Sequence, residues 1–466
     1  MKGYKMAGTI SSLGVGSSIL TQDVLDQLRK ADEAAKVTPI TLKIADMQDR
    51  NSAMTKVQGW MDALATSVSS IASKTLYTER TANVTGSAVS VTADANTDLQ
   101  SFTIKVNNLA TKEINESGSF TAKTDLIASG TGSLNLNIGG TDYTINYDAT
   151  TTLDDLKKAI NTVAGDKVNA SIVQLGTNDF RLFMTAVETG DAQNMTITDT
   201  SGLLNGTQLT TGMTTVQDGV NASFEFNNQL VSRSSNEITD LVAGLTITLQ
   251  TAGETSTVDI TQNRDAIIEK LNDFVSKYNT AMTEIGNMTK ADQDAEKSGI
   301  FSSTSVIKSM QRQLQDMLVQ LGGGESIFNY GFDQDKYGKL SFDSTKFNTL
   351  MDANPANVEA VLSGGTFTNT DGTTKTLTGF FAEYQTGVES YTKYNGILDT
   401  FATNLKDDQG RLEDQKALAI ERLDKKYDLM AKQFAAYDAM INKINQQSSF
   451  LTQMISAAKS SSSSSS

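Results

Sequence analysis

Residues 416–455 read KALAIERLDKKYDLMAKQFAAYDAMINKINQQSSFLTQMI, and this stretch decides how the chain folds. Apolar residues recur in it at alternating steps of three and four, which places them along one seam of an α-helix. Neither Gly nor Pro occurs in residues 412–455, so the helix is predicted to run without a break. The predicted seam comprises Ile420, Leu423, Tyr427, Met430, Phe434, Tyr437, Ile441 and Ile444.

A helix of this kind must bury its seam against a partner. The repeat extends over about five heptads, which favours a coiled coil within the chain or between chains. The alternative is a long helix in the core of one globular domain. Residues 40–74 carry a similar seam at the other end of the chain, and we predict them as the intramolecular partner. That second seam comprises Ile40, Ile44, Met47, Met54, Val57, Met61, Leu64, Val68 and Ile71.

The composition excludes several classes of chemistry. The 466 residues include no cysteine and no histidine, so disulfides, catalytic triads with histidine and histidine-based zinc sites are ruled out. No stretch approaches the ~18 apolar residues of a membrane span, and membrane insertion is not expected. The N-terminal sequence lacks the apolar core of a secretory signal peptide. We therefore expect a cytoplasmic protein, or one exported without a cleaved signal.

The charge is unevenly distributed along the chain. Residues 78–262 carry 9 basic and 21 acidic groups, whereas residues 405–466 carry 9 basic and 8 acidic groups. An acidic middle argues against nucleic acid binding, because phosphate contacts need basic side chains.

The middle of the chain is predicted to be rich in β-structure. Apolar and polar residues alternate around Phe102, Ile104 and Val106, and again on both sides of Gly139-Gly140, which indicates a hairpin. One helix is expected at residues 152–163. The pattern predicts two small β-rich domains, joined near residues 207–218.

Three acidic segments of the chain are candidate sites for chemistry. The segment from Asp333 to Leu340 resembles the start of a calcium loop, but Tyr337 and Ser344 stand where ligands are needed, so a turn at Gly338 is predicted. The pairs Asp154-Asp155 and Asp407-Asp408 are adjacent, so on a helix they diverge, and both are predicted to be solvated helix starts. We predict no catalytic, cofactor-binding or metal residues and no enzyme, although a glycosidase built on two carboxylates stays open.

Several motifs together resemble the flagellar hook-associated protein 2 family, whose members cap the flagellar filament. The run Gln446-Gln447-Ser448-Ser449-Phe450-Leu451 is the most similar, and residues 152–198 resemble a repeat of flagellin-like proteins. The other motifs are Gly14-x-Gly16, Val24-Leu25-x-x-Leu28, Pro39, residues 218–222, residues 234–238, residues 244–249, Leu271-x-x-Phe274-Val275-x-x-Tyr278-Asn279 and residues 331–343.

The resemblance, with the patterns above, implies an α+β multidomain fold. N- and C-terminal helices pair into a coiled-coil-like leg, and two β-rich head domains are inserted between them. The expected parts are an N-terminal segment, disordered or a short helix (1–38); a leg helix (39–77); head domain 1 in two pieces (78–112 and 213–262); an outer head domain 2 with one helix (113–212); a leg domain with a small β segment (263–445); and a C-terminal segment with a Ser-rich tail (446–466).

The resemblance also implies a function and partners. The chain is expected to form a homo-oligomeric ring of about four to six copies at the distal tip of the filament. There it retains exported flagellin and promotes its folding and insertion. Further expected partners are a hook-associated junction protein, an export chaperone at the C-terminal segment, and host surface glycans. The expected partner-binding residues are Gln446, Gln447, Ser448, Phe450, Leu451 and Ile455.

Two alternatives stay open at this stage. Another flagellar axial protein, either a flagellin or a hook–filament junction protein, shares the paired terminal helices. An adhesin would instead act through the acidic β-rich head.

Overall fold

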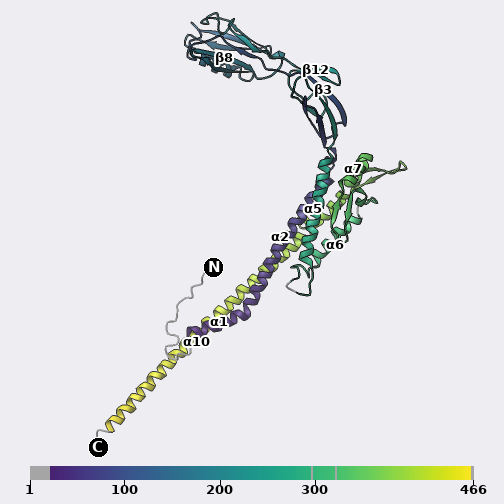
Figure 1. Cartoon of the computed structure of the whole chain (residues 1–466). Helices are drawn as coiled ribbons and strands as arrows, with labels where there is room; N and C mark the ends of the chain where they lie inside the picture. The colour runs from purple at the N-terminus through teal and green to yellow at the C-terminus, as the bar shows by residue number, and fades with distance from the viewer. Residues whose placement is uncertain (1–20, 295–296, 321–322, 463–466) are drawn as a thin grey trace. The chain divides into compact units, whose positions relative to one another are not determined.

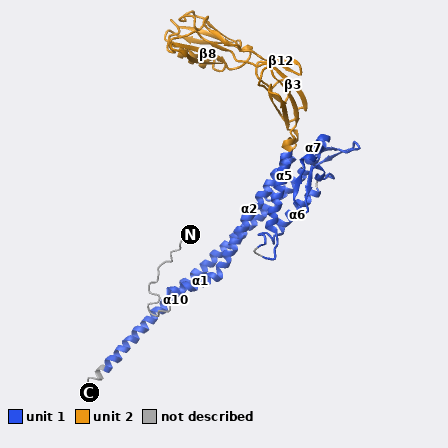
Figure 2. Ribbon diagram, in the orientation of Figure 1, with its two compact units in different colours: residues 1–72, 268–466 blue, residues 73–267 orange. Residues whose placement is uncertain are grey.

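The computed structural model describes residues 21–294, 297–320 and 323–462. The chain divides into two compact units, residues 1–72 with 268–466 and residues 73–267 (Figure 2). The first unit is built from both ends of the chain and is mainly helical, and the second is β-rich (Figure 1). The family-like Gly14 and Gly16, and the last serines of the tail, lie outside the described residues.

Long helices dominate the first unit. Their bounds are α1 Gln22–Lys36, α2 Thr38–Ala72, α5 Arg264–Thr289, α6 Ser305–Gln320, α7 Ser344–Ala353, α8 Pro355–Ser363, α9 Phe380–Thr392 and α10 Ile397–Ser462. Two antiparallel hairpins accompany them, β16 (Phe332–Gln334) with β17 (Leu340–Phe342) and β18 (Gly365–Thr368) with β19 (Thr374–Leu377).

The core of the helical unit lies where α2 packs against α9 and α10. The seam predicted for residues 40–74 is buried from Met54 to Ile71. Phe274 of α5 meets Phe381 of α9 edge-to-face with 5.0 Å between ring centroids. Aromatic pairs of this geometry add to the stabilisation from burial alone.

The last helix starts earlier than the sequence predicted. Instead of beginning at Lys416, α10 begins at Ile397 and contains Gly410. A glycine inside a helix costs only about 1 kcal/mol, and packing against neighbouring helices offsets this. The break before α10 falls at Asn395, whose φ of 56° lies in the left-handed region, followed by Gly396. The sequence pattern of residues 380–405 predicts one helix, but the structure divides this range between α9 and α10.

Two further predictions of helix ends need correction. The sequence pattern of residues 345–362 predicts one helix, but the structure divides it at Asn354, because the helical region is disfavoured for the residue before a proline, here Pro355. At the C-terminus, the low complexity of the serine run Ser461–Ser466 predicts disorder, but α10 includes Ser461 and Ser462.

A β-sandwich forms one part of the second unit. A five-stranded sheet in the order β1-β15-β3-β11-β12 faces a three-stranded sheet in the order β13-β14-β2. Phe102, Ile104 and Val106 are buried between them, as their alternation predicted. The bounds are β1 Arg80–Thr85, β2 Val89–Ala93, β3 Gln100–Asn108, β11 Ala222–Phe226, β12 Gln229–Arg233, β13 Glu237–Ile238, β14 Leu245–Leu249 and β15 Thr255–Gln262.

A second core is inserted between β3 and β11. Sheets in the orders β10-β4-β8-β7 and β6-β5-β9 enclose it together with α4 (Leu153–Val163). Gly139 and Gly140, at φ of 60° and 75°, turn the chain from β5 into β6. β10 pairs with β4, so the insert reaches Gln217, beyond the expected boundary at residue 212. The strands are β4 Ile114–Glu116, β5 Gly132–Ile138, β6 Thr141–Tyr147, β7 Val168–Gly176, β8 Asp179–Ala186, β9 Met195–Asp199 and β10 Thr214–Gln217.

Candidate functional site on the C-terminal helix

The helix α10 pairs in turn with α2 and α1. Asn51 of α2 donates a 2.7 Å hydrogen bond from Nδ2 to Oε1 of Gln409, near the start of α10. Further along α10, Leu423 and Tyr427 pack against Leu25 of α1. The sequence predicted the 40–74 helix as partner of the seam. In the structure, the seam at Leu423 and Tyr427 packs against α1 instead. This is because α10 begins at Ile397, so that α2 packs against earlier turns of α10.

The connection between α1 and α2 explains how both reach α10. α1 ends at Lys36, and α2 starts at Thr38 with Pro39 in its first turn. A proline has no N–H to continue the α1 ladder, but it is tolerated in the first turn of a new helix. The chain therefore passes from one helix to the next with Val37 as the only residue between them.

Ion pairs and hydrogen bonds of charged side chains connect α1 to α10. Nζ of Lys426 lies 2.6 Å from Oδ2 of Asp32, and the Tyr427 hydroxyl donates to the same oxygen at 3.0 Å. Arg29 pairs with Asp424. The hydrogen bond from Lys426, and then that from Tyr427, lowers the pKa of Asp32 below its ordinary 3.8. Burial, followed by the bond to Asp32, raises the pKa of the Tyr427 hydroxyl.

The predicted seam residues are not equally covered. Leu423 and Tyr427 are buried, whereas Ile420, Met430, Phe434 and Ile441 are half-buried. Tyr437 and Ile444 share the same spacing, but their side chains are 58% and 55% exposed. The burial of the seam thus decreases towards the C-terminal end of α10.

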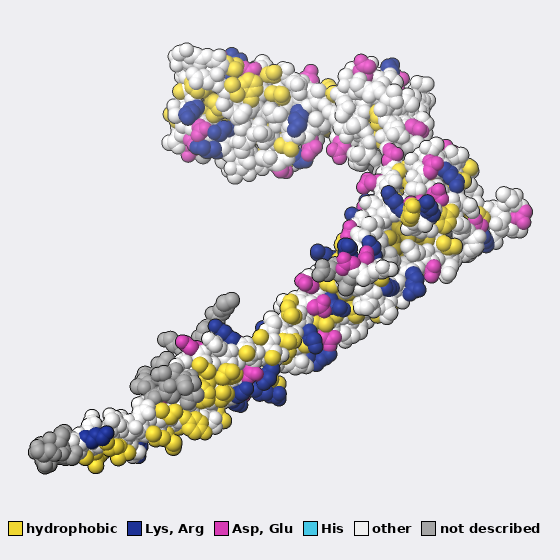
Figure 3. Space-filling model, turned by 60° about the horizontal axis from the view of Figure 1, so that its bottom comes forward, with side chains coloured by type: hydrophobic (Ala, Val, Ile, Leu, Met, Phe, Trp, Pro, Cys, Tyr) yellow, Lys and Arg dark blue, Asp and Glu magenta, His cyan; other side chains and the backbone are white. Residues whose placement is uncertain are grey.

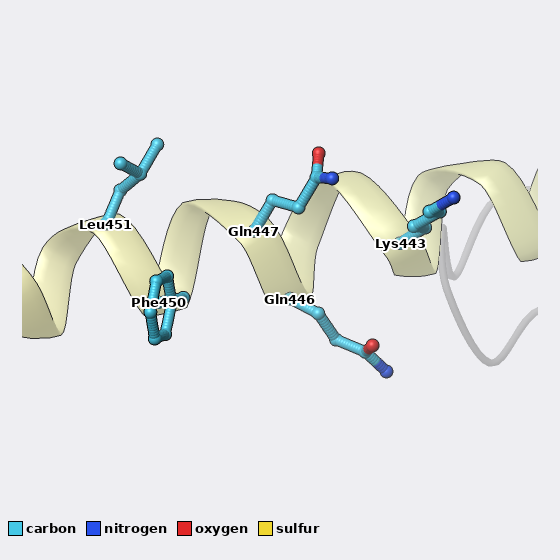
Figure 4. A pocket seen from close by; sticks show the side chains of 5 residues that line it. All are labelled: Lys443, Gln446, Gln447, Phe450 and Leu451. Atoms are coloured by element: carbon cyan, nitrogen blue, oxygen red, sulfur yellow. The ribbon is translucent and has the colours of Figure 1, made fainter.

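The predicted partner-binding residues lie on the exposed end of α10. Gln446, Gln447 and Ser448 are exposed, and the larger side chains Phe450, Leu451 and Ile455 are 57–61% exposed. An open hollow on this surface is lined by Lys443, Gln446, Gln447, Phe450 and Leu451 (Figure 4). In this view Gln447 and Leu451 project to one side of the helix, and Gln446 to the other.

Sequence reasoning missed two members of this exposed surface. Met440 and Met454 are 62% and 54% exposed. Hydrophobic side chains gather on the surface along the end of the helix (Figure 3). Neither methionine follows the spacing of the seam. The only signal in the sequence is that both lie in the same stretch of helix as Leu451 and Ile455. Exposed apolar side chains gathered in this way mark an interaction surface.

The acidic clusters are structural in this fold. Asp155 forms a capping box with Thr152 at the start of α4, and Asp154 pairs with Lys157 at 2.6 Å, which lowers its pKa to about 2. In the turn between β16 and β17, Asp335 Oδ1 accepts the N–H groups of Tyr337 and Lys339. Gly338 there has a φ of 83°, as the predicted turn requires.

Asp407 and Asp408 need a correction, because they lie inside α10 and not at a helix start. Asp408 pairs with Arg411 one turn later. Within the described ranges, no three acidic side chains gather as a metal site needs. None of the helices in those ranges is both long and apolar enough to cross a membrane.

Comparisons with known proteins identify the family. The family model for the flagellar hook-associated protein 2 N-terminus matches residues 17–113, and that for its C-terminus matches residues 219–446. The chain belongs to the flagellar hook-associated protein 2 family. The flagellin hook IN motif matches residues 133–186, which overlaps the flagellin-like region noted in the sequence.

Relatives of this family resemble the chain over most of its length. Flagellar hook-associated protein 2 from Campylobacter jejuni is 27% identical over 76% of this chain, which spans 64% of that longer protein. The Salmonella typhimurium protein is also 27% identical, with 96% of this chain and 99% of that protein covered.

A solved structure shows the same fold. The D1-D2-D3 domains of the flagellar cap protein FliD from Escherichia coli superpose with a TM-score of 0.58 at 23% identity. The match covers 76% of this chain and 99% of that chain. Paired terminal helices with a β-rich middle are therefore the fold of this chain, as the sequence predicted.

Proposed function

We propose that this chain is the subunit of the cap at the distal tip of a bacterial flagellar filament. Copies of it oligomerise there, retain exported flagellin and promote its insertion into the growing filament. Membership of the hook-associated protein 2 family supports this, together with the exposed apolar end of α10. The exposed apolar end of α10 is the observation that carries the proposal. Burial of side chains such as Phe450 and Leu451 under a partner would stabilise the complex, whereas in the single chain they stay exposed to water.

The parts of the chain take distinct roles in this proposal. The paired helices α1, α2 and α10 form the leg, and the two β-rich cores form the head, with the outer core inserted in the inner one. The residues from Gln446 to Ile455 bind partners, first the export chaperone and then other proteins at the filament tip. Export proceeds through the flagellar apparatus without a cleaved signal.

A truncation tests the proposal. A chain that lacks residues 440–466 keeps the described cores and should fold, but it should fail to support filaments in a host without its own cap protein. Filaments are counted by electron microscopy, and a chain that lacks only residues 463–466 is the matched control. Filaments of normal length with the longer truncation would contradict the proposal.

The oligomeric state separates the cap from other axial proteins. We expect light scattering after size-exclusion chromatography to give a closed ring of about four to six copies. A flagellin would instead form long filaments, and this alternative is not favoured by the family assignment. A strict monomer at high concentration would count against the cap. Binding of the intact chain to a glycan array tests the adhesin role, which stays a prediction.

A further inference from the structure

Two linkers join the two β-rich cores of the second unit. We call the β-sandwich the inner core and the insert between β3 and β11 the outer core (Figure 1). The linkers are residues 109–113, between β3 and β4, and residues 218–221, between β10 and β11. Each core has its own apolar cluster. The contacts that couple the two cores are therefore those made at the linkers and beside them.

The two linkers are hydrogen-bonded to each other. The N–H of Thr111 donates to the carbonyl oxygen of Val220 at 3.0 Å, and the Thr111 hydroxyl donates to that of Asp218 at 2.6 Å. The side-chain amide of Gln217 donates to the carbonyl oxygen of Lys112 at 2.7 Å. These bonds fix backbone torsions of both linkers, so the linkers resist bending more than two separate strands of chain would.

Amide side chains fix both linkers to the inner core. Asn236 accepts the N–H of Ala110 at 2.7 Å and donates to the carbonyl oxygen of the same residue at 2.9 Å. Asn108, at the end of β3, donates to the carbonyl oxygen of Asn221 at 2.8 Å. Each linker therefore has a fixed path where it leaves the inner core.

Three consecutive residues of the outer core reach the inner core beside the linkers. They are Thr189, Gly190 and Asp191, between β8 and β9, and we call them the bridging tripeptide. The hydroxyl of Thr189 donates to the carbonyl oxygen of Ser234, in the loop between β12 and β13. The N–H of Asp191 donates to Oδ1 of Asn221 at 3.2 Å. The bridging tripeptide thus connects the cores at a point outside the linkers themselves.

Gly190 is buried at the centre of this contact and has no room for a side chain. Its N–H donates to the carbonyl oxygen of Thr111 at 3.0 Å. A Cβ added to it would lie 2.8 Å from Oδ1 of Asn221 and 2.8 Å from Cβ of Ser234, which is closer than van der Waals contact. Its φ of 108° is also one that residues with a Cβ rarely adopt. The buried Gly219 lies against it, because a Cβ there would come within 2.7 Å of the Gly190 carbonyl oxygen.

We propose that the bridging tripeptide holds the inner and outer cores in one fixed arrangement, so that they move as a single rigid body. Two linkers alone would form a hinge, since a few residues are enough to absorb the torsion changes of a hinge motion. A bend at the linkers has to break the hydrogen bonds of Thr189 and Asp191 at the same time. A partner that displaces the outer core therefore displaces the inner core as well. The inference does not rest on the proposed cap function, because it concerns contacts within one chain.

Spin labels test this arrangement in the intact chain. The natural chain contains no cysteine, so Leu175→Cys in β7 and Leu230→Cys in β12 place one label on each core. The natural side chains at these positions are 54% and 72% exposed. The labelled chain is diluted with an excess of unlabelled natural chain, which removes couplings between copies. Pulsed electron–electron double resonance should then give one narrow distribution of the distance between the labels.

Gly190→Ala should release the bridging tripeptide. The distance distribution should widen at least about twofold, because the added Cβ does not fit against Asn221 and Ser234 and the linkers then act as a hinge. Thr189→Val removes the hydrogen bond to Ser234 with little change of side-chain shape and should widen the distribution to a smaller extent. The matched control is Gly140→Ala in the outer core, where φ is 75° but no atom lies within 4 Å of an added Cβ. Its distribution should stay as narrow as that of the unsubstituted chain.

The outcomes decide between a fixed arrangement and a hinge. A broad distribution in the unsubstituted chain would overturn the proposal. So would an unchanged width in Gly190→Ala, or in Thr189→Val if circular dichroism shows that Gly190→Ala does not fold. Equal widening in Gly140→Ala would also overturn it, because backbone strain and not the bridging tripeptide would then be the cause. The cap function is tested separately by the truncation and by the oligomeric state.

Discussion

Lys426 and Asp32 stand 394 residues apart in sequence, and their side chains meet at 2.6 Å where α1 lies on α10. With Leu25, Leu423 and Tyr427 they hold the first described helix of the chain to the last one. Among the side chains of α1, Leu25 is the buried one. The contact between α1 and α10 is therefore small, and single substitutions in it are expected to change how firmly α1 is docked.

Removing the lysine should loosen α1 without unfolding the unit. In Lys426→Met, amide hydrogen exchange in α1 should rise by a few-fold at most, because an exposed ion pair contributes little. High salt should have the same effect on the natural chain. The matched control is Lys425→Met, which removes the exposed pair with Glu421 instead. If both variants change exchange in α1 equally, the Asp32 contact has no special role.

Removing the apolar part of the contact should have a larger effect. Leu423 is 2% exposed, and truncation of a buried Leu to Ala costs about 2–5 kcal/mol. In Leu423→Ala we therefore expect the amides of α1 to exchange as fast as those of an undocked helix. Leu418→Ala, on the exposed face, should leave α1 protected at concentrations where the chain is monomeric. Retained protection of α1 in Leu423→Ala would show that other contacts hold it.

The docking of α1 should depend on pH at both extremes. Because the pKa of folded Asp32 lies below 3.8, its charge stabilises the docked state above about pH 4, and this contribution is lost as the pH falls further. The pKa of Tyr427 is raised above 10, so its contribution is complete below pH 10 and is lost above it. Amide hydrogen exchange rates in α1, corrected for the intrinsic pH dependence of exchange, should therefore be constant between about pH 5 and 9. In Asp32→Asn the acid limb should disappear.

The capping box of α4 should stabilise the β-rich unit. Thr152 accepts the N–H of Asp155, and an N-cap Thr→Ala change typically costs about 1 kcal/mol. In Thr152→Ala the transition of this unit in scanning calorimetry should fall by ~2–4 °C. Thr162→Ala, in the same helix but with its hydroxyl bonded back to Lys158, is the control and should not lower it. An unchanged transition in Thr152→Ala would mean that the cap is not needed.

The site itself shows how far sequence reasoning reaches. Tyr427 and Ile444 belong to the same apolar seam, yet Tyr427 is buried under α1 and Ile444 is exposed. The spacing of the apolar residues indicates only that one face of the helix α10 is apolar. Whether a partner from the same chain covers it depends on how far α1 extends along α10.

Local patterns in the sequence predict most of the helices and strands of this protein and which of their faces are apolar, but not where each helix begins and ends. The alternation at Phe102, Ile104 and Val106 and the long C-terminal seam both depend on neighbouring residues, so local patterns are enough to predict them. The tertiary structure decided where Gly410 continues a helix while Asn395 and Gly396 end one, and that α1 covers Leu423. Those outcomes depend on contacts between distant segments, whose energies local patterns do not contain.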